Sequence, residues 1–73
     1  MNPDDLIALL RLQPFQSFTV HVNNGSKFEV RHPDQAMVVG EMLLVAHDGD
    51  QLERIAILNI AHITTAEGAQ RAR

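Results

Sequence analysis

Cysteine, tryptophan and tyrosine are all absent from this chain of 73 residues, and only three phenylalanines supply benzene rings. Without cysteine, no disulfide can brace the fold and no zinc site can be built from cysteine pairs. A chain of this length buries only about 60% of its unfolded surface, so a lone domain of this size is marginally stable. We therefore expect one domain, and we expect self-association to be its main additional support.

Positive charge is also scarce. Six Lys and Arg stand against nine Asp and Glu, which gives a net charge of −3. Between Pro14 and Ala66 the only cations are Lys27, Arg31 and Arg54. Neutralisation of phosphates by Lys and Arg provides most of the non-specific affinity for nucleic acid. The charge balance therefore disfavours RNA binding, and these three residues are the nucleic-acid contacts we expect if RNA is bound.

Long apolar runs are missing as well. No stretch approaches the roughly 20 apolar residues that span a bilayer. Asp4 and Asp5 stand where a secretory signal would carry basic residues. Together with the lack of cysteine, these features predict a cytoplasmic protein that makes no membrane contact.

The N-terminal segment has the pattern of a short amphipathic helix. Asn2 is suited to cap its first turn, and Pro3 is tolerated at the first helical position because its missing N–H would have no partner there. Apolar residues then recur at helical spacing, and Gln13 is pushed out of the helical region by Pro14. The sequence predicts a helix over about 3–12 with an apolar stripe that docks on the rest of the domain.

After Phe15 the apolar period changes from 3.6 to 2. Phe18–Val22 and Lys27–Arg31 each alternate between apolar and polar residues, and Asn24-Gly25 lies between them. Asn-Gly is the strongest short signal for a hairpin turn. Further along, Pro33 interrupts the sheet and can start one helical turn. We expect the remaining strands at Met37–Val39, Met42–His47, Arg54–Ile60 and Ile63–Ala66, with a kink near Ala61-His62.

This order predicts a mainly β fold with one N-terminal helix, specifically a small, partly open, five-stranded antiparallel barrel of the SH3 or Sm type. Residues 1–66 form the single predicted domain, with the barrel over about 15–66. Residues 67–73 are expected to form a flexible tail.

Two of the later strands differ from the hairpin because they are apolar on both faces. A strand of this kind needs two dry surfaces. One surface is the core, and the other is covered either by the N-terminal helix or by a neighbouring subunit. The second alternative predicts a homo-oligomer whose interface contains Met42, Leu43, Leu44, Val45, Ile55, Ile57 and Leu58.

The helix followed by Val20–Phe28, with its Asn-Gly turn, resembles the opening of the Sm, Lsm and Hfq proteins. The ending Ala61–Thr65 is similar to the short turn before their last strand. This resemblance implies a ring of several subunits that binds RNA around its pore. The segments Arg31–Asp34 and His62–Thr64 are also similar to short uncharacterised bacterial proteins, which implies no particular function.

Catalytic and metal-binding patterns are not evident in the sequence. The four histidines, His21, His32, His47 and His62, are separated by intervals that match no metal-ligand motif. There is no nucleophile elbow and no glycine-rich phosphate loop. We therefore expect no enzyme activity, no catalytic residues, no metal and no cofactor. The sequence favours a self-associating interaction module with an unknown protein partner, and a ring-forming RNA binder of the Sm type is the alternative.

Overall fold

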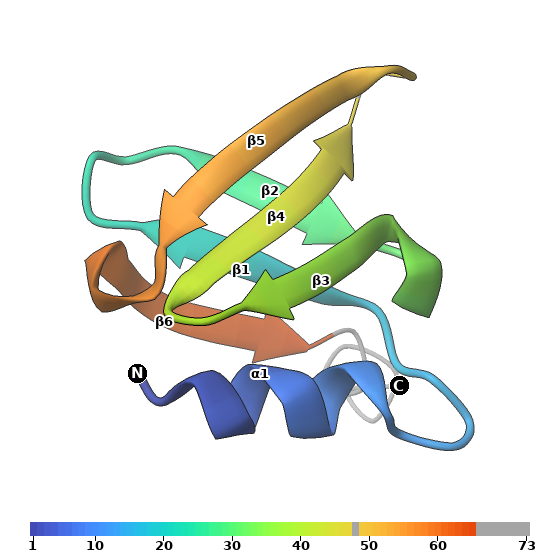
Figure 1. The fold of residues 1–73 in the computed structure, drawn as a ribbon. Helices are drawn as coiled ribbons and strands as arrows, with labels where there is room; N and C mark the ends of the chain where they lie inside the picture. Colours follow the sequence, from blue (N-terminus) through green and yellow to red (C-terminus); the bar gives the residue numbers. More distant parts are fainter. Residues whose placement is uncertain (48, 66–73) are drawn as a thin grey trace, which may run out of the picture.

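The computed structural model describes residues 1–47 and 49–65. This part of the chain is mainly β, with one α-helix at its N-terminal end (Figure 1). Its elements are α1 (Pro3–Leu10), β1 (Phe18–Val22), β2 (Lys27–Val30), the 3₁₀ turn η1 (Pro33–Gln35), β3 (Ala36–Val39), β4 (Met42–His47), β5 (Gln51–Ala56), the 3₁₀ turn η2 (Ile57–Asn59) and β6 (Ile60–Thr65). The predicted tail at 67–73 and the last residue of the predicted barrel, Ala66, lie outside the described residues.

Helix α1 begins as the sequence predicts. The Asp4 backbone N–H donates to Asn2 Oδ1 over 2.9 Å, so Asn2 is the N-cap. The helix ends at Leu10, two residues earlier than expected, because Arg11 leaves the helical conformation and its N–H is shared between the carbonyls of Ile7 and Ala8. None of the described helices has the length and apolar character needed to cross a bilayer.

The strands form two three-stranded antiparallel sheets, in the orders β2–β1–β6 and β3–β4–β5. In Figure 1 the second sheet lies in front of the first, and α1 lies along one end of both. The mainly β fold with one N-terminal helix is confirmed, whereas the structure has six strands in two sheets that do not form a closed barrel, instead of the five strands predicted. Pro33 is the physical reason, because it cannot donate to a ladder and starts η1 between β2 and β3.

The β1–β2 hairpin confirms the sequence prediction. Phe18 pairs with Val30 and Val20 with Phe28, which brings the apolar positions of both strands to one face. Gly25 occupies the turn with a φ of 93°, a left-handed conformation that favours glycine.

The predicted strand Arg54–Ile60 was placed too late in the chain. Strand β5 already begins at Gln51 and ends at Ala56, because the N–H of Ile57 turns away to donate to the carbonyl of Glu41 over 2.9 Å. The turn η2 follows, and β6 begins at Ile60 rather than Ile63.

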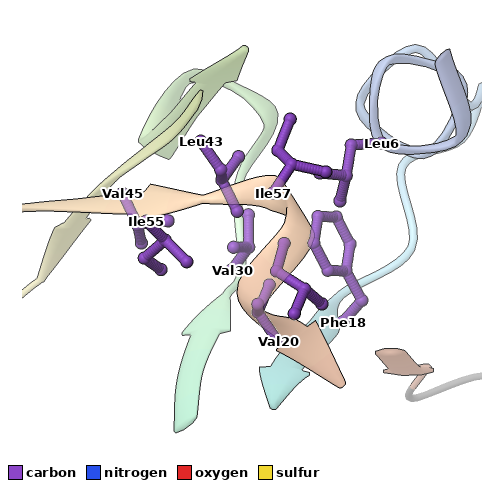
Figure 2. Close-up of a cluster of buried hydrophobic side chains, with 9 residues drawn as sticks. Leu6, Phe18, Val20, Val30, Leu43, Val45, Ile55 and Ile57 are labelled. Atoms are coloured by element: carbon purple, nitrogen blue, oxygen red, sulfur yellow. The ribbon is translucent and has the colours of Figure 1, made fainter. Parts of the chain in front are cut away.

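The core lies between the two sheets and under α1. Figure 2 shows Leu6 reaching from the helix toward Ile57 and Phe18. All three side chains are 0–1% exposed. The helix therefore covers one end of the core, to which both sheets contribute. The buried set is Leu6, Phe18, Val20, Val30, Leu43, Val45, Ile55, Ile57 and Ile60.

Candidate interaction surface

Alternation along β4 divides its apolar side chains between two surfaces. Leu43 and Val45 point into the core and are fully buried. Met42, Leu44 and Ala46 occupy the intervening positions and therefore point to the opposite side of the sheet. The apolar character of both faces, visible in the sequence, thus corresponds to an inner face in the core and an outer face away from it.

The strands beside β4 extend this outer surface. Met37 on β3 and Arg54 on β5 flank Leu44, and the rows on either side add further apolar side chains. We call this surface the outer face; it consists of Met37, Val39, Met42, Leu44, Ala46, Leu52, Arg54 and Ala56. Arg54 is the one charged residue among these eight.

Five of the eight residues of the outer face are exposed, and Leu44, Ala46 and Ala56 are half-buried. Met37 is 55% exposed, Val39 53% and Leu52 60%. A hollow of about 350 Å³ on this surface is lined by Met37, Leu44, Ala46 and Leu52, together with Asp34, Gln35 and Ala36. Figure 1 shows α1 at the end of the sheets, and no described element passes in front of β4. The helix therefore covers the core and leaves the outer face open.

The interface residues predicted from the sequence fall into two groups in the structure. Leu43, Val45, Ile55 and Ile57 are at most 5% exposed and belong to the core, so a partner cannot reach them. Met42 and Leu44 lie on the outer face. Leu58 is 74% exposed but belongs to η2, outside that face.

Three exposed apolar residues of the outer face were missing from the predicted set: Met37, Val39 and Leu52. The sequence does contain a signal for them, since the even or odd position along a strand decides its face. Using that signal requires the register of β4 against both neighbours, because a slip of one residue would reverse every assignment.

The predicted nucleic-acid contacts do not share one surface. Lys27 and Arg31 line a hollow of about 590 Å³ beside Phe28, along the edge strand β2. The guanidinium of Arg31 lies 3.0 Å from the Glu29 carboxylate, which offsets its charge. Arg54 belongs to the other sheet, on the outer face. Arg54 lines a second hollow, of about 160 Å³, which it shares with Phe28 but not with Lys27 or Arg31.

Two of the four histidines lie together in the structure. His21 and His62 stack with ring centres 4.2 Å apart and planes inclined by 12°. His47 pairs with the Glu53 carboxylate at 3.1 Å and contacts the ring of Phe28. His32 is exposed between β2 and η1. No cluster of three or more His, Asp or Glu suited to a metal ion occurs among residues 1–47 and 49–65.

The stacked pair affects the protonation of His21. Partial burial lowers the pKa of His21 below its ordinary value, and the charges of His62 and Lys27 lower it further. Both neighbours lie directly opposite His21, on β6 and β2 respectively.

The arrangement as a whole is a small protein with one polar and one apolar sheet surface. The polar surface holds the histidine pair, and the apolar outer face is open. Comparison of the chain with protein-family models, curated proteins and solved structures found no match.

Proposed function

We propose that this protein is a non-catalytic, self-associating interaction module, and that a second copy of the chain binds the outer face. The observation that carries the proposal is the open apolar face of the β3–β4–β5 sheet. Large contiguous apolar surfaces are rare on monomers, and where they occur they commonly serve as interaction sites.

A second copy suits this face for two reasons. An apolar patch is complementary to itself across a two-fold axis, so the same residues can serve both sides of a dimer. In addition, burial of apolar surface stabilises a protein by about 25 cal/mol per Å². A chain of 73 residues has a small core, so extra buried area adds a larger share of its stability than it would in a large protein.

Arg54 indicates how two copies face each other. It lies in one row with Leu44 and Met37, at the β5 edge of the sheet. A two-fold axis running across the strands would bring β5 over β5 and Arg54 close to its own copy. An axis running along the strands instead brings β5 over the partner's β3, where Asp34 lines the same hollow as Met37. Charge complementarity therefore favours the second arrangement, with Arg54 near Asp34 of the partner subunit.

The first test is the molar mass of the purified protein in solution. Because the chain has neither Trp nor Tyr, size exclusion is combined with light scattering and refractive-index detection. We expect an oligomer that Leu52→Asp dissociates, since a charge would then be buried in the contact. Leu58→Asp is the matched control, an exposed leucine outside the outer face, and should leave the oligomer intact. A folded wild-type monomer would overturn the proposal.

The orientation is tested separately by exchanging charges. We expect Arg54→Asp and Asp34→Arg each to weaken association, and the double variant to restore it. If both single variants associate like the wild type, the arrangement along the strands is wrong, while self-association through the outer face still stands.

An RNA-binding ring of the Sm type is the alternative. Its support is the order of elements: a helix, a hairpin, and a 3₁₀ turn between β5 and β6, with β2 and β3 as one bent strand broken at Pro33. Counted in this way, the strands number five, as in an open SH3- or Sm-like barrel. Nuclease-sensitive absorbance at 260 nm that travels with the oligomer would favour this alternative over the interaction module.

A further inference from the structure

The sulfur atoms of this protein are concentrated on the outer face. The chain has no cysteine, so its three methionines carry all of its sulfur. Met37 and Met42 belong to the outer face and are 55% and 38% exposed. Met1 is 48% exposed and precedes α1, outside that face. Two of the three oxidisable sulfur atoms therefore lie on the surface that we propose for self-association.

Met42 lies in the middle of this surface. It belongs to β4, the central strand of the β3–β4–β5 sheet. Its partners on β3 and β5 are Val39 and Ala56, so its row is apolar from one edge to the other. In the arrangement that places β5 over the partner's β3, β4 lies over the partner's β4. Met42 would then face Met42 of the partner subunit.

Met37 has a different neighbourhood. It lies on β3 and shares its row with Leu44 and Arg54. In the same arrangement Met37 would face Arg54 of the partner subunit. A guanidinium carries several hydrogen-bond donors, so a polar atom at this position would find a partner across the contact. At Met42 the row offers no side-chain donor.

A peroxide converts a methionine side chain from apolar to polar in one step. The thioether sulfur attacks one oxygen of the peroxide, an S–O bond forms and the O–O bond breaks. With hydrogen peroxide, the second oxygen leaves as water. The sulfur loses two electrons, the peroxide is reduced, and the product is a sulfoxide that methionine sulfoxide reductases convert back to the thioether.

We propose that oxidation of Met42 by a peroxide releases the second copy from the outer face, an inference that rests on the proposed function. In the free chain, water donates to the sulfoxide oxygen. In the contact, two such oxygens would meet across the axis, and both are acceptors without a donor. Oxidation of Met37 has a smaller effect, because Arg54 of the partner subunit donates to that sulfoxide.

The first test measures how association affects the rate of oxidation. The purified protein is treated with hydrogen peroxide, and mass spectrometry of its peptides follows the sulfoxide at each methionine. Because the contact would cover Met42 and leave Met1 free, we expect the rate at Met42 relative to Met1 to fall several-fold as the protein concentration rises. Met1 is the internal standard for the reagent. A rate ratio that stays constant over the range in which the oligomer forms would overturn the proposal.

The second test measures how oxidation affects association. Light scattering gives the dissociation constant before and after treatment, and each variant is compared with its own untreated sample. We expect oxidation to raise the dissociation constant of the wild type by about tenfold or more. Met42→Leu has a similar volume but no sulfur atom and should lose most of this rise, whereas Met37→Leu is the matched control and should keep most of it. Circular dichroism checks that the oxidised protein is folded, and treatment with methionine sulfoxide reductases should restore the original constant.

Two outcomes distinguish this inference from the proposed function. If fully oxidised Met42 leaves the oligomer intact while Leu52→Asp dissociates the untreated protein, the effect of oxidation is wrong and self-association through the outer face stands. If the untreated wild type is a folded monomer, both are wrong.

Discussion

The side-chain amide of Gln35 donates to the carbonyl of Ala46 over 2.8 Å and joins the turn η1 to strand β4. The same nitrogen donates to the carbonyl of Glu29 at 2.8 Å, and Gln35 Oε1 accepts from the N–H of Arg31 at 2.7 Å. One side chain therefore satisfies three backbone groups where Pro33 interrupts the strand. Because Glu29 belongs to β2 and Ala46 to β4, these hydrogen bonds connect the two sheets.

Removing this amide should destabilise the protein. We expect Gln35→Ala to lower the free energy of unfolding by about 1 kcal/mol, because it leaves the partly buried Ala46 carbonyl without this partner and removes two exposed hydrogen bonds. Gln35→Glu should also be destabilising, since a carboxylate can accept from Arg31 but cannot donate to the two carbonyls. Urea unfolding measures both effects. Gln51→Ala, at an exposed position of β5, is the control, and an equal loss there would contradict the role of Gln35.

Leu43 and Leu44 are adjacent in sequence but should respond differently to truncation. Leu43→Ala opens a cavity in the core and should cost about 2–5 kcal/mol at every protein concentration. Leu44→Ala acts on the outer face, so its effect should grow with concentration as association contributes more to stability. Unfolding curves at several protein concentrations distinguish the two. Identical curves for Leu44→Ala at all concentrations would remove Leu44 from the interface.

Acid should weaken the fold through His21. Its pKa is lower in the folded chain than the ordinary 6.5, so below pH 6.5 the unfolded chain binds the proton more readily. The contribution of His21 is therefore complete above pH 6.5 and is lost as the pH falls through the folded value. His62 and Lys27 lie opposite His21 and disfavour its protonated form. The Glu29 carboxylate in the adjoining hollow acts in the opposite direction.

The measurement is the unfolding temperature of wild type and His21→Gln between pH 7.5 and 5. We expect the wild type to lose more stability than the variant over this range, while His32→Gln follows the wild type. Parallel curves for wild type and His21→Gln would show that the pair does not couple protonation to folding.

The N-cap of α1 is a fourth test. Asn2→Ala removes the acceptor for the Asp4 N–H and should lower the free energy of unfolding by about 1 kcal/mol. Asn2→Asp should retain most of the stability, because a carboxylate also accepts this bond. Far-ultraviolet circular dichroism with thermal unfolding compares the variants, and an unchanged Asn2→Ala would mean that α1 contributes little to the cooperative unit.

Local chemistry made several elements predictable from the sequence. Asn2 and Pro3 fix the start of α1, and Asn24-Gly25 fixes the turn of the first hairpin, because these signals act over a few residues. Pro33 likewise predicts the helical turn that η1 contains. The mainly β character followed from the change of apolar period after Phe15.

Non-local contacts decided the rest. The sequence showed that Leu43 and Leu44 are both apolar, but only pairing with β3 and β5 assigns one to the core and the other to the outer face. The end of β5 at Ala56 depends on a bond from Ile57 to Glu41, far away in the chain. The sequence interval between His21 and His62 matches no ligand motif, and their stacking depends on a single extra residue, Ala61, in β6. Strand register is set by cooperative packing of the whole sheet, so the sequence determined which segments form strands and the tertiary structure decided what each side chain faces.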